Sequence, residues 1–186
     1  MTPVLVDSPK DLDGDGQSEY GAQLEKQREF YKNTLASIPN IISGAPLLID
    51  GYNPLGLTFV PAGISISQAE NNYAYEHPYR HQGVRHPRTA VALTGDNHIL
   101  MVVADGRRKN YCYGFTAKEL TQFLIDHFDP KYALNLDGGG SSTLCVEKCG
   151  DSDTHVVNYP CEGITNKDLT VIQERTVQSF LYIVKE

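Results

Sequence analysis

The chain has 186 residues, of which 40% are hydrophobic. This length and composition suffice for one globular domain with its own core. The formal net charge of −7 argues against nucleic acid or an anionic membrane surface as a partner of the whole chain. No apolar run approaches the roughly 20 residues of a membrane span, and residues 1–7 lack the basic start and apolar stretch of a signal peptide.

The N-terminal segment is acidic and rich in glycine. Asp11, Asp13 and Asp15 alternate with other residues before Gly16, as in the first half of a calcium-binding loop. The twelfth position of such a loop is Ala22, where a bidentate glutamate belongs, so a complete EF-hand is not expected. Two interpretations stay open. Asp11, Asp13 and Asp15 bind Ca²⁺ in a looser site, or the segment is an acidic turn without metal.

The first half of the chain is expected to hold one helix and two short strands. Residues 21–35 contain strong helix formers with apolar residues near helical spacing, and Pro39 ends this helix. Short apolar runs at 47–49 and 57–60 are typical of strands. Residues 65–88 are polar and aromatic and are predicted to form a long surface loop, which in a compact domain is more often functional than not.

A hairpin and a capped helix follow. Residues 89–94 and 98–104 are predicted strands joined by a Gly-Asp-Asn turn. Thr116 starts a helix, and Glu119 three residues later completes a capping box. Pro130 ends this helix, because proline cannot continue the hydrogen-bond ladder.

Three further strands are predicted, at 132–136, 141–146 and 176–184. The order of elements predicts an α+β domain with a mixed, largely antiparallel β-sheet core and a few flanking helices. Residues 1–186 are interpreted as a single domain, in which residues 1–40 form an acidic loop plus a helix and residues 41–186 form the core.

The segment Asn135–Ser142, Asn-Leu-Asp-Gly-Gly-Gly-Ser-Ser, is the most informative motif. Consecutive glycines let backbone N–H groups point into a small concavity. Hydroxyls at Ser141 and Ser142 add donors, and Asp137 places an acid or base at the rim. This combination suits an oxyanion or a cluster of sugar hydroxyls. The alternative is a strained turn between two strands.

Other glycine motifs are excluded. A phosphate-binding P-loop requires a lysine that this segment lacks, and no Gly-x-Gly-x-x-Gly fingerprint opens a helix here. The Gly-x-Ser-x-Gly elbow of serine hydrolases is also absent. Ser141 is therefore a poor candidate for a nucleophile.

Two basic clusters flank the predicted hairpin, at residues 85–89 and 105–109. Because the two ends of a hairpin lie side by side, both clusters are expected at one edge of the sheet. Arginine matches two oxygens of a phosphate or carboxylate at once. Asp105 and Asp137 each follow an apolar strand and precede a glycine, which favours a shared cleft. The alternative is a pair of solvated, charged turns.

The four cysteines do not have the paired CxxC spacing of a zinc site. Cys145 lies in a predicted apolar strand and is expected in the core. Cys149 and Cys161 flank a polar loop, where they would pair in an oxidising compartment and otherwise remain free thiols.

Several short motifs occur in an order that resembles the phosphodiester glycosidase family. The most specific is the Asn-Leu-Asp-Gly-Gly-Gly-Ser-Ser block at 135–142. The others are a Pro-Arg-Thr-Ala strand (87–90), an Asp-Gly-Arg strand end (105–107), a helix start (114–120), a Val-Val-Asn-x-Pro segment (156–160) and a Glu-Arg pair (174–175). The family's usual Asn-Gly-(Gly/Ser)-x-Phe-Phe motif is not found ahead of Gly44–Leu47. Two interpretations stay open: the chain is a fragment or compact variant that lacks the usual N-terminal part of the family, or the helix predicted at 21–35 replaces that part.

The resemblance implies a hydrolase that cleaves a sugar-1-phosphodiester, such as an N-acetylglucosamine-1-phosphodiester. It assigns catalysis to Asp137 and Asp105 as carboxylates and to Arg88 and Arg107 as the phosphate clamp. The substrate-binding residues that we carry over are Asn135, Gly138, Gly139, Gly140, Ser141, Ser142, Thr89, Asn158, Arg175 and His86. It also favours a bacterial-type enzyme of carbohydrate metabolism that is extracytoplasmic or secreted.

Three rival functions stay open. The chain hydrolyses an exopolysaccharide or cell-wall glycan without phosphate, it binds glycan without catalysis, or it is a structural module that binds calcium. Eleven tyrosines and no tryptophan argue against a tryptophan platform for sugar stacking. Tyr73, Tyr75 and Tyr79 are the candidates for that part.

Overall fold

A computed structural model describes residues 28–34, 36–38, 40–108, 110–162 and 174–184 of the chain. The chain divides into two compact units, residues 1–43 and 44–186. In the first unit, residues 28–34 and 36–37 are helical, as expected of part of the helix predicted at 21–35. Asp11, Asp13 and Asp15 lie outside the described residues, so the calcium site stays a prediction.

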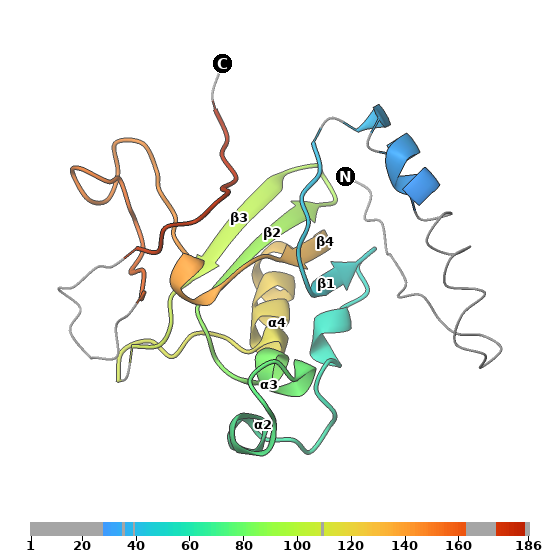
Figure 1. The fold of residues 1–186 in the computed structure, drawn as a ribbon, viewed down its shortest axis with the longest axis vertical. Helices are drawn as coiled ribbons and strands as arrows, with labels where there is room; N and C mark the ends of the chain where they lie inside the picture. The colour runs from blue at the N-terminus through green and yellow to red at the C-terminus, as the bar shows by residue number, and fades with distance from the viewer. Residues whose placement is uncertain (1–27, 35, 39, 109, 163–173, 185–186) are drawn as a thin grey trace. The chain divides into compact units, whose positions relative to one another are not determined.

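The second unit is built on a four-stranded sheet with the order β1-β4-β2-β3 (Figure 1). Its strands are β1 (Leu47–Asp50), β2 (Arg88–Thr94), β3 (Ile99–Ala104) and β4 (Pro130–Asn135). All three strand pairs are antiparallel. The α+β class and the hairpin of β2 and β3 are therefore confirmed.

One long helix, α4 (Ala117–Phe128), packs against the sheet. The predicted capping box is present, because the Thr116 hydroxyl accepts from the Glu119 amide (3.0 Å) and the Glu119 carboxylate accepts from the Thr116 amide (2.9 Å). The helix ends at Asp129, which has a left-handed backbone, and Pro130 then begins β4. Local sequence signals thus set both ends of this helix.

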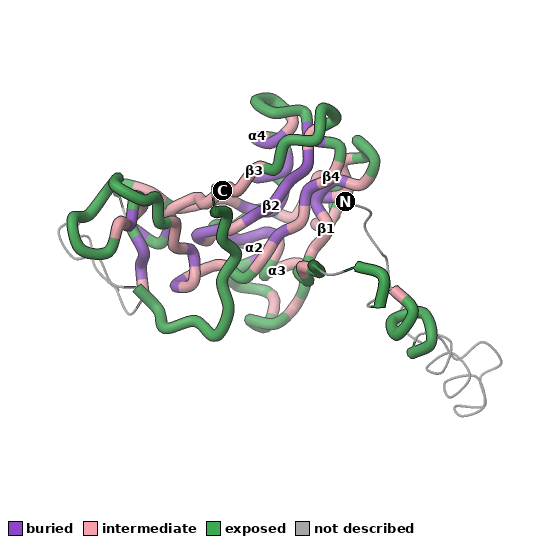
Figure 2. Tube along the Cα trace, turned by 90° about the horizontal axis from the view of Figure 1, so that it is seen from above, coloured by how far each residue is buried: buried purple, intermediate pink, exposed green. Residues whose placement is uncertain are grey.

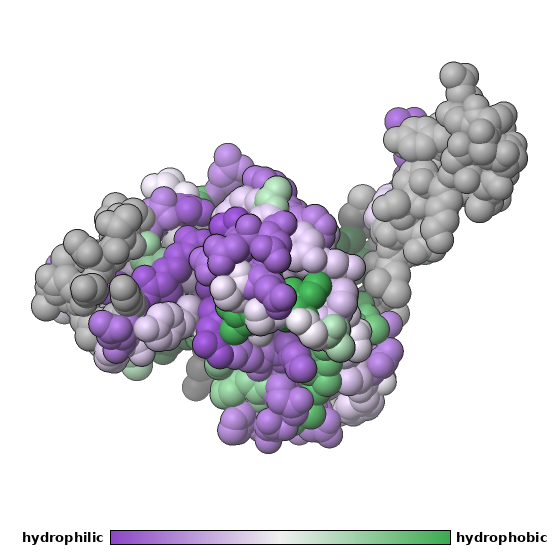
Figure 3. Space-filling view, turned by 90° about the horizontal axis from the view of Figure 1, so that it is seen from below, coloured by the Kyte–Doolittle hydropathy of each residue, from purple (hydrophilic) through white to green (hydrophobic). Residues whose placement is uncertain are grey.

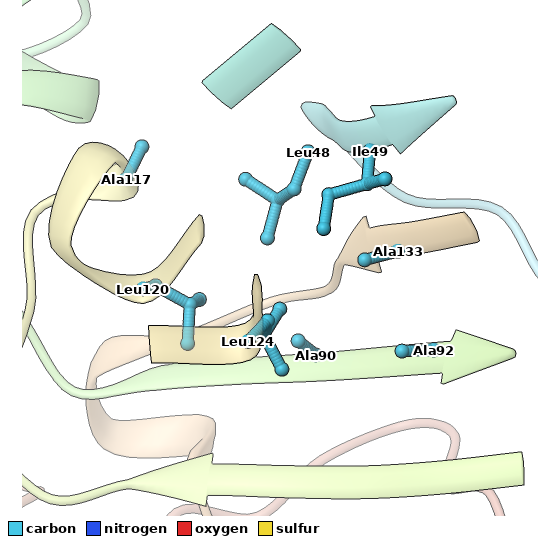
Figure 4. Packing of buried hydrophobic residues seen from close by; sticks show 8 residues of the cluster. All are labelled: Leu48, Ile49, Ala90, Ala92, Ala117, Leu120, Leu124 and Ala133. Carbon is cyan, nitrogen blue, oxygen red and sulfur yellow. The ribbon is translucent and has the colours of Figure 1, made fainter. Parts of the chain in front are cut away.

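The core lies between α4 and one face of the sheet. Leu120 and Leu124 of the helix are almost fully buried and belong to one cluster with the small side chains of Ala90, Ala92 and Ala133, with Leu124 beside Ala90 (Figure 4). Buried residues are concentrated in the central strands and in α4 (Figure 2). Alanines on the strands let the helix approach closely, and burial of the leucines supplies the hydrophobic stabilisation.

The strand predicted at 57–60 is wrong. Residues Leu55–Leu57 form a 3-10 turn, η1, and residues 58–60 form a bend. Gly56 packs so closely on α4 that an added Cβ would lie 1.9 Å from the Thr121 hydroxyl oxygen. This tight contact with a helix, which depends on tertiary packing, replaces strand pairing.

The loop predicted at 65–88 contains two short helices instead, α2 (Ile66–Asn72) and α3 (Pro78–Gly83). Ser65 caps α2 through a capping box with Gln68. The His77 imidazole accepts from the Tyr79 amide at the start of α3, where proline occupies the first turn. These local caps were overlooked because the segment is polar and aromatic overall.

The strands predicted at 141–146 and 176–184 are also wrong. The glycine loop turns into a 3-10 helix, η2 (Gly139–Ser141), and Cys145 makes one isolated bridge with Val156. The described residues 174–184 pair with no described strand. Their apolar side chains are exposed, and the exposed fraction of Phe180 is 79%. The β-propensity of these residues therefore does not produce a strand, because no described strand pairs with them.

The cysteines are free thiols in the structure. Cys145, expected in the core, is exposed because its segment is not a strand. Cys149 is exposed and Cys161 is buried, and burial raises the pKa of the Cys161 thiol.

Within the described ranges, no helix is both long and apolar enough to cross a membrane. The same residues contain no group of three or more His, Cys, Asp or Glu side chains that could hold a metal ion. Seen from the side of α2 and α3, hydrophilic side chains predominate and apolar ones form small patches (Figure 3).

The contact between α4 and the sheet predicts a large effect of truncating its central leucine. We expect Leu124→Ala to lower the free energy of unfolding by about 2–5 kcal/mol, because Leu124 is fully buried and leaves a cavity. Urea denaturation measures this change, with Ile99→Ala on exposed β3 surface as the matched control. An equal effect of the two substitutions would contradict the assignment of the core.

Candidate functional site

Three strand ends meet at one edge of the sheet. In the antiparallel register, Arg88 at the start of β2 lies opposite Ala104 at the end of β3. Asn135 at the end of β4 lies opposite Ala90. The structure therefore brings the basic cluster before β2, the cluster after β3 and the glycine loop after β4 to the same edge, as the hairpin geometry predicted.

A cavity of about 290 Å³ lies at this edge. Its lining is mostly polar and includes three arginines, two histidines, one aspartate and two glycines. They are Arg88, Arg107, Arg175, His81, His86, Asp137, Gly138 and Gly139, with Asn135 and Tyr75 beside them. Positive charge is thus concentrated at one place on an acidic chain.

Arg107 is an exposed cation of the cavity, as is Arg175. Its backbone is left-handed (φ 57°), and its guanidinium lies directly over Gly139, where an added Cβ would be 3.1 Å from both terminal nitrogens. Its Nη2 is 3.5 Å from Nδ1 of His86. Gly139 itself has φ 62°, so the backbone favours glycine at this position, and a side chain here would displace the guanidinium slightly.

Arg88 also lines the cavity, but it is buried and its guanidinium bonds within the protein, so its predicted phosphate contact stays a prediction. Its Nε donates to the carbonyl of Phe115 (3.0 Å), and its Nη2 donates to the carbonyls of His81 (2.7 Å) and Val84 (3.1 Å). These bonds tie the start of β2 to α3 and to the segment before α4. Burial, with a smaller contribution from Arg107, lowers the pKa of Arg88 to about 10, so it remains charged at neutral pH.

The two arginines should therefore respond differently to truncation. We expect Arg88→Ala to lower the free energy of unfolding by more than about 3 kcal/mol, because three buried or half-buried hydrogen bonds lose their charged donor. Arg107→Ala, on exposed surface, should change it by less than about 0.5 kcal/mol. Chemical denaturation of both variants measures the contrast, and a stable Arg88→Ala protein would refute the structural role.

The cavity holds two histidines whose neutral forms are favoured. Burial is the main cause that lowers the pKa of His86 to about 4, and the neighbouring Arg88 and Arg107 lower it further. Burial and Arg88 also lower the pKa of His81, while the Asp137 carboxylate acts in the opposite direction. At neutral pH both imidazoles are uncharged, so the positive charge of the cavity comes from the arginines.

The shifted titration of His86 predicts a loss of stability in acid. Between its unfolded pKa of 6.5 and its folded pKa of about 4, the unfolded chain binds the extra proton. The free energy of unfolding should therefore fall as the pH is lowered through this window, and His86→Asn should make the fall shallower. Urea denaturation at several pH values measures both slopes, with His127→Asn on exposed α4 surface as the control. Identical slopes in native protein and His86→Asn would contradict the assignment.

Asp137 stands at the rim of the cavity and is exposed. Its Oδ1 accepts from the amide of Gly138 (2.9 Å), which fixes the carboxylate at the end of β4. Arg175 lies at the same cavity but is paired with Glu162, whose Oε2 accepts from Nε at 2.8 Å and Nη2 at 2.7 Å. A third contact joins Arg175 Nη1 to the Ser141 hydroxyl at 3.5 Å.

The glycine loop does not form the open concavity of amides that was predicted. The amide of Gly139 donates to the carbonyl of Pro87 (2.9 Å), and the amides of Ser141 and Ser142 close the 3-10 turn. The Gly138 amide donates to Asp137, and Gly140 packs against the Glu162 carboxylate. The glycines instead allow the loop to pass very close to the start of β2, where an added Cβ on Gly138 would lie 2.7 Å from the Pro87 carbonyl.

Asp105 does not share the cavity with Asp137. Its Oδ1 accepts from the side chain of Asn158 (2.8 Å) and from the amide of Tyr159 (3.0 Å). Asn158 also donates to the Ser142 carbonyl (2.9 Å) and accepts from the Leu144 amide (2.8 Å). Asp105 and Asn158 thus form a bracket that positions the chain after the glycine loop.

Three other predicted binding residues also have internal partners. The Thr89 hydroxyl donates to the Ser142 hydroxyl (3.1 Å), and Ser142 is buried. Asn135 is buried at the cavity wall and donates to the carbonyls of Ala45 (2.9 Å) and Leu136 (2.7 Å). Of the residues carried over from the motifs, His86, Arg107 and Asp137 are those that the structure both brings together and leaves open to a ligand.

His81 is a site residue that sequence reasoning missed. It lies on α3, inside the segment interpreted as a loop, and its backbone carbonyl holds Arg88. The signal available was the concentration of histidine and arginine in residues 77–88, which marked the segment as functional without selecting this residue.

A second cavity, of about 560 Å³, lies between β3 and α4 and is mostly apolar. Its charged residues Arg85 and Glu119 are paired with each other. The third charged residue of this cavity, Asp105, accepts a hydrogen bond from the Asn158 side chain. The smaller cavity is the stronger candidate for chemistry, because it combines an exposed arginine, an exposed carboxylate and neutral imidazoles.

Comparison with known proteins places the chain in a family. A sequence model of the phosphodiester glycosidase family matches residues 11–184, which is nearly the whole chain. No curated protein matches the chain. The chain belongs to the phosphodiester glycosidase family.

Two solved structures are similar to part of this chain. The catalytic domain of zebrafish N-acetylglucosamine-1-phosphodiester alpha-N-acetylglucosaminidase, auto-inhibited by its pro-peptide, is 23% identical with a TM-score of 0.44, over 64% of this chain and 34% of that one. A Burkholderia pseudomallei protein described as exported is 31% identical with a TM-score of 0.37, over 43% and 14%. The chain therefore spans about a third and a seventh of these two proteins.

Proposed function

We propose that the chain is a glycosidase that hydrolyses a sugar-1-phosphodiester. The observation that carries the proposal is one cavity lined by the exposed guanidinium of Arg107 and the exposed carboxylate of Asp137. Membership of the phosphodiester glycosidase family supports a glycosidic bond as the target. The sugar and the phosphodiester are what the family resemblance implies, and the arginines of the cavity support an anionic substrate.

Arg107 is the residue that binds the phosphate. Its guanidinium is exposed in the cavity, held above Gly139, and offers paired N–H groups to two phosphate oxygens. The charge of Arg88 behind it adds electrostatic attraction while its Nε and Nη2 remain bonded to carbonyls. Arg175 lies at the same cavity, partly neutralised by Glu162.

Hydrolysis breaks the bond between the anomeric carbon and the phosphate oxygen. Water adds to the anomeric carbon, the bonding electrons leave with the phosphate oxygen, and the products are the free sugar and a phosphate monoester. A phosphate monoester is a good leaving group, so proton donation to it matters less than charge stabilisation. Asp137 accepts the proton of the attacking water or stabilises the cationic sugar centre.

His86 adapts the cavity to an anion. In the free protein it is neutral, since the arginines and burial disfavour its protonation. Phosphate bound at Arg107 would offset this repulsion and raise the pKa of His86. A neutral imidazole 3.5 Å from Arg107 also keeps that guanidinium in position without adding a competing charge.

Substitution of Asp137 tests the proposal. We expect Asp137→Asn to reduce release of phosphate monoester from a methyl-phosphodiester of N-acetylglucosamine 1-phosphate by at least about 100-fold, because an amide cannot accept the proton. Asp126→Asn, an exposed substitution on α4, should leave turnover unchanged. Thermal denaturation of both variants checks that the fold is intact.

The other results of this assay have defined meanings. Undiminished turnover by folded Asp137→Asn would remove Asp137 from catalysis. Cleavage restricted to phosphate-free glycans would refute the phosphate-binding role of Arg107, and saturable sugar binding without product would make the chain a glycan-binding domain. An extracytoplasmic or secreted location stays a prediction of the family resemblance.

A further inference from the structure

Tyr75 presents an exposed aromatic ring to the candidate site. It lies in the turn between α2 and α3, which is closed by a hydrogen bond from the His77 amide to the Ala74 carbonyl (3.0 Å). Tyr75 is 54% exposed and is the one tyrosine among the described residues that line the 290 Å³ cavity. An open ring beside charged groups offers a ligand an apolar surface in an otherwise polar site.

The surrounding residues hold this ring in place. The Arg80 guanidinium lies 5.7 Å from the centre of the Tyr75 ring, and its Nη1 donates to the Tyr73 carbonyl (3.2 Å). Tyr73, His77 and Tyr79 pack on one another, with ring centres 4.5–5.5 Å apart. Those three rings anchor the turn, so Tyr75 alone of the three candidate tyrosines is left to face the cavity.

We propose that Tyr75 forms a sugar subsite, in which one face of the pyranose ring stacks on the tyrosine while the phosphate lies on Arg107. This inference rests on the proposed function, because that function supplies a sugar attached to a phosphate. A pyranose has an apolar face of C–H groups, which pack on an aromatic ring while its hydroxyls stay solvated or hydrogen-bonded. The chain contains no tryptophan, so tyrosine is the larger ring available for this task.

Stacking and anion binding make separable demands on the cavity. Removal of the Tyr75 ring should weaken binding of a neutral sugar but leave the arginines, and thus phosphate binding, unchanged. Removal of the Arg107 guanidinium should have the opposite effect. Arg80→Ala should weaken sugar binding to an intermediate extent, since the Tyr75 ring would remain but lose its support.

The test is an NMR titration with methyl N-acetyl-α-glucosaminide and, separately, with methyl phosphate. We expect Tyr75→Ala to bind the neutral sugar roughly tenfold more weakly than native protein, and Tyr75→Phe to bind it about equally well. The matched control is Tyr111→Ala, because Tyr111 is 60% exposed and does not line the cavity. All three tyrosine variants should bind methyl phosphate as native protein does.

In turnover of the sugar-1-phosphodiester, Tyr75→Ala should raise KM more than it lowers kcat. Native affinity of Tyr75→Ala for the neutral sugar would overturn the subsite, as would failure of native protein to bind that sugar at all. If native protein binds the sugar through Tyr75 but releases no phosphate monoester, the subsite stands and the proposed hydrolysis fails. The two inferences are therefore distinguishable.

Discussion

The buried guanidinium of Arg88 joins three parts of the chain that are distant in sequence. It lies at the first residue of β2 and donates to carbonyls at His81, Val84 and Phe115. These carbonyls belong to α3, to the turn after it and to the segment that leads into α4. This one side chain therefore adds three hydrogen bonds between the central strand and the cavity wall that carries His81 and His86, and its removal would leave three carbonyl acceptors without their charged donor.

The electrostatics of the cavity follow from this arrangement. Burying one arginine beside an exposed one concentrates positive charge, and the protein offsets the repulsion by keeping His81 and His86 neutral. Such a site is stabilised by an anion, which would reduce the repulsion between Arg88 and Arg107. The chain thus concentrates positive charge at one cavity although its net charge is −7.

The polar residues of the motifs form two groups, one that makes internal hydrogen bonds and one that lines the cavity. Asp105, Asn158 and Ser142 bond to one another and to backbone groups, so they shape the loop that follows β4. Arg107 and Asp137 face the cavity. Their residue types do not separate the groups, because Asp105 and Asp137 have the same strand–Asp–Gly context. Asp105 differs because Asn158 and Tyr159, 53 and 54 positions along the chain, donate hydrogen bonds to its carboxylate.

Much of the fold was predictable from local physics. The capping box at Thr116, the proline at residue 130 and the hairpin turn set the limits of α4, β2 and β3, because each acts on its immediate neighbours. The family motif likewise pointed to Asp137 and Arg107. The sequence did not reveal the burial of Arg88, the closed glycine loop, the bracket at Asp105 or the placement of Tyr75. Each of these depends on packing between segments that are distant in sequence, and no local sequence pattern predicts such contacts.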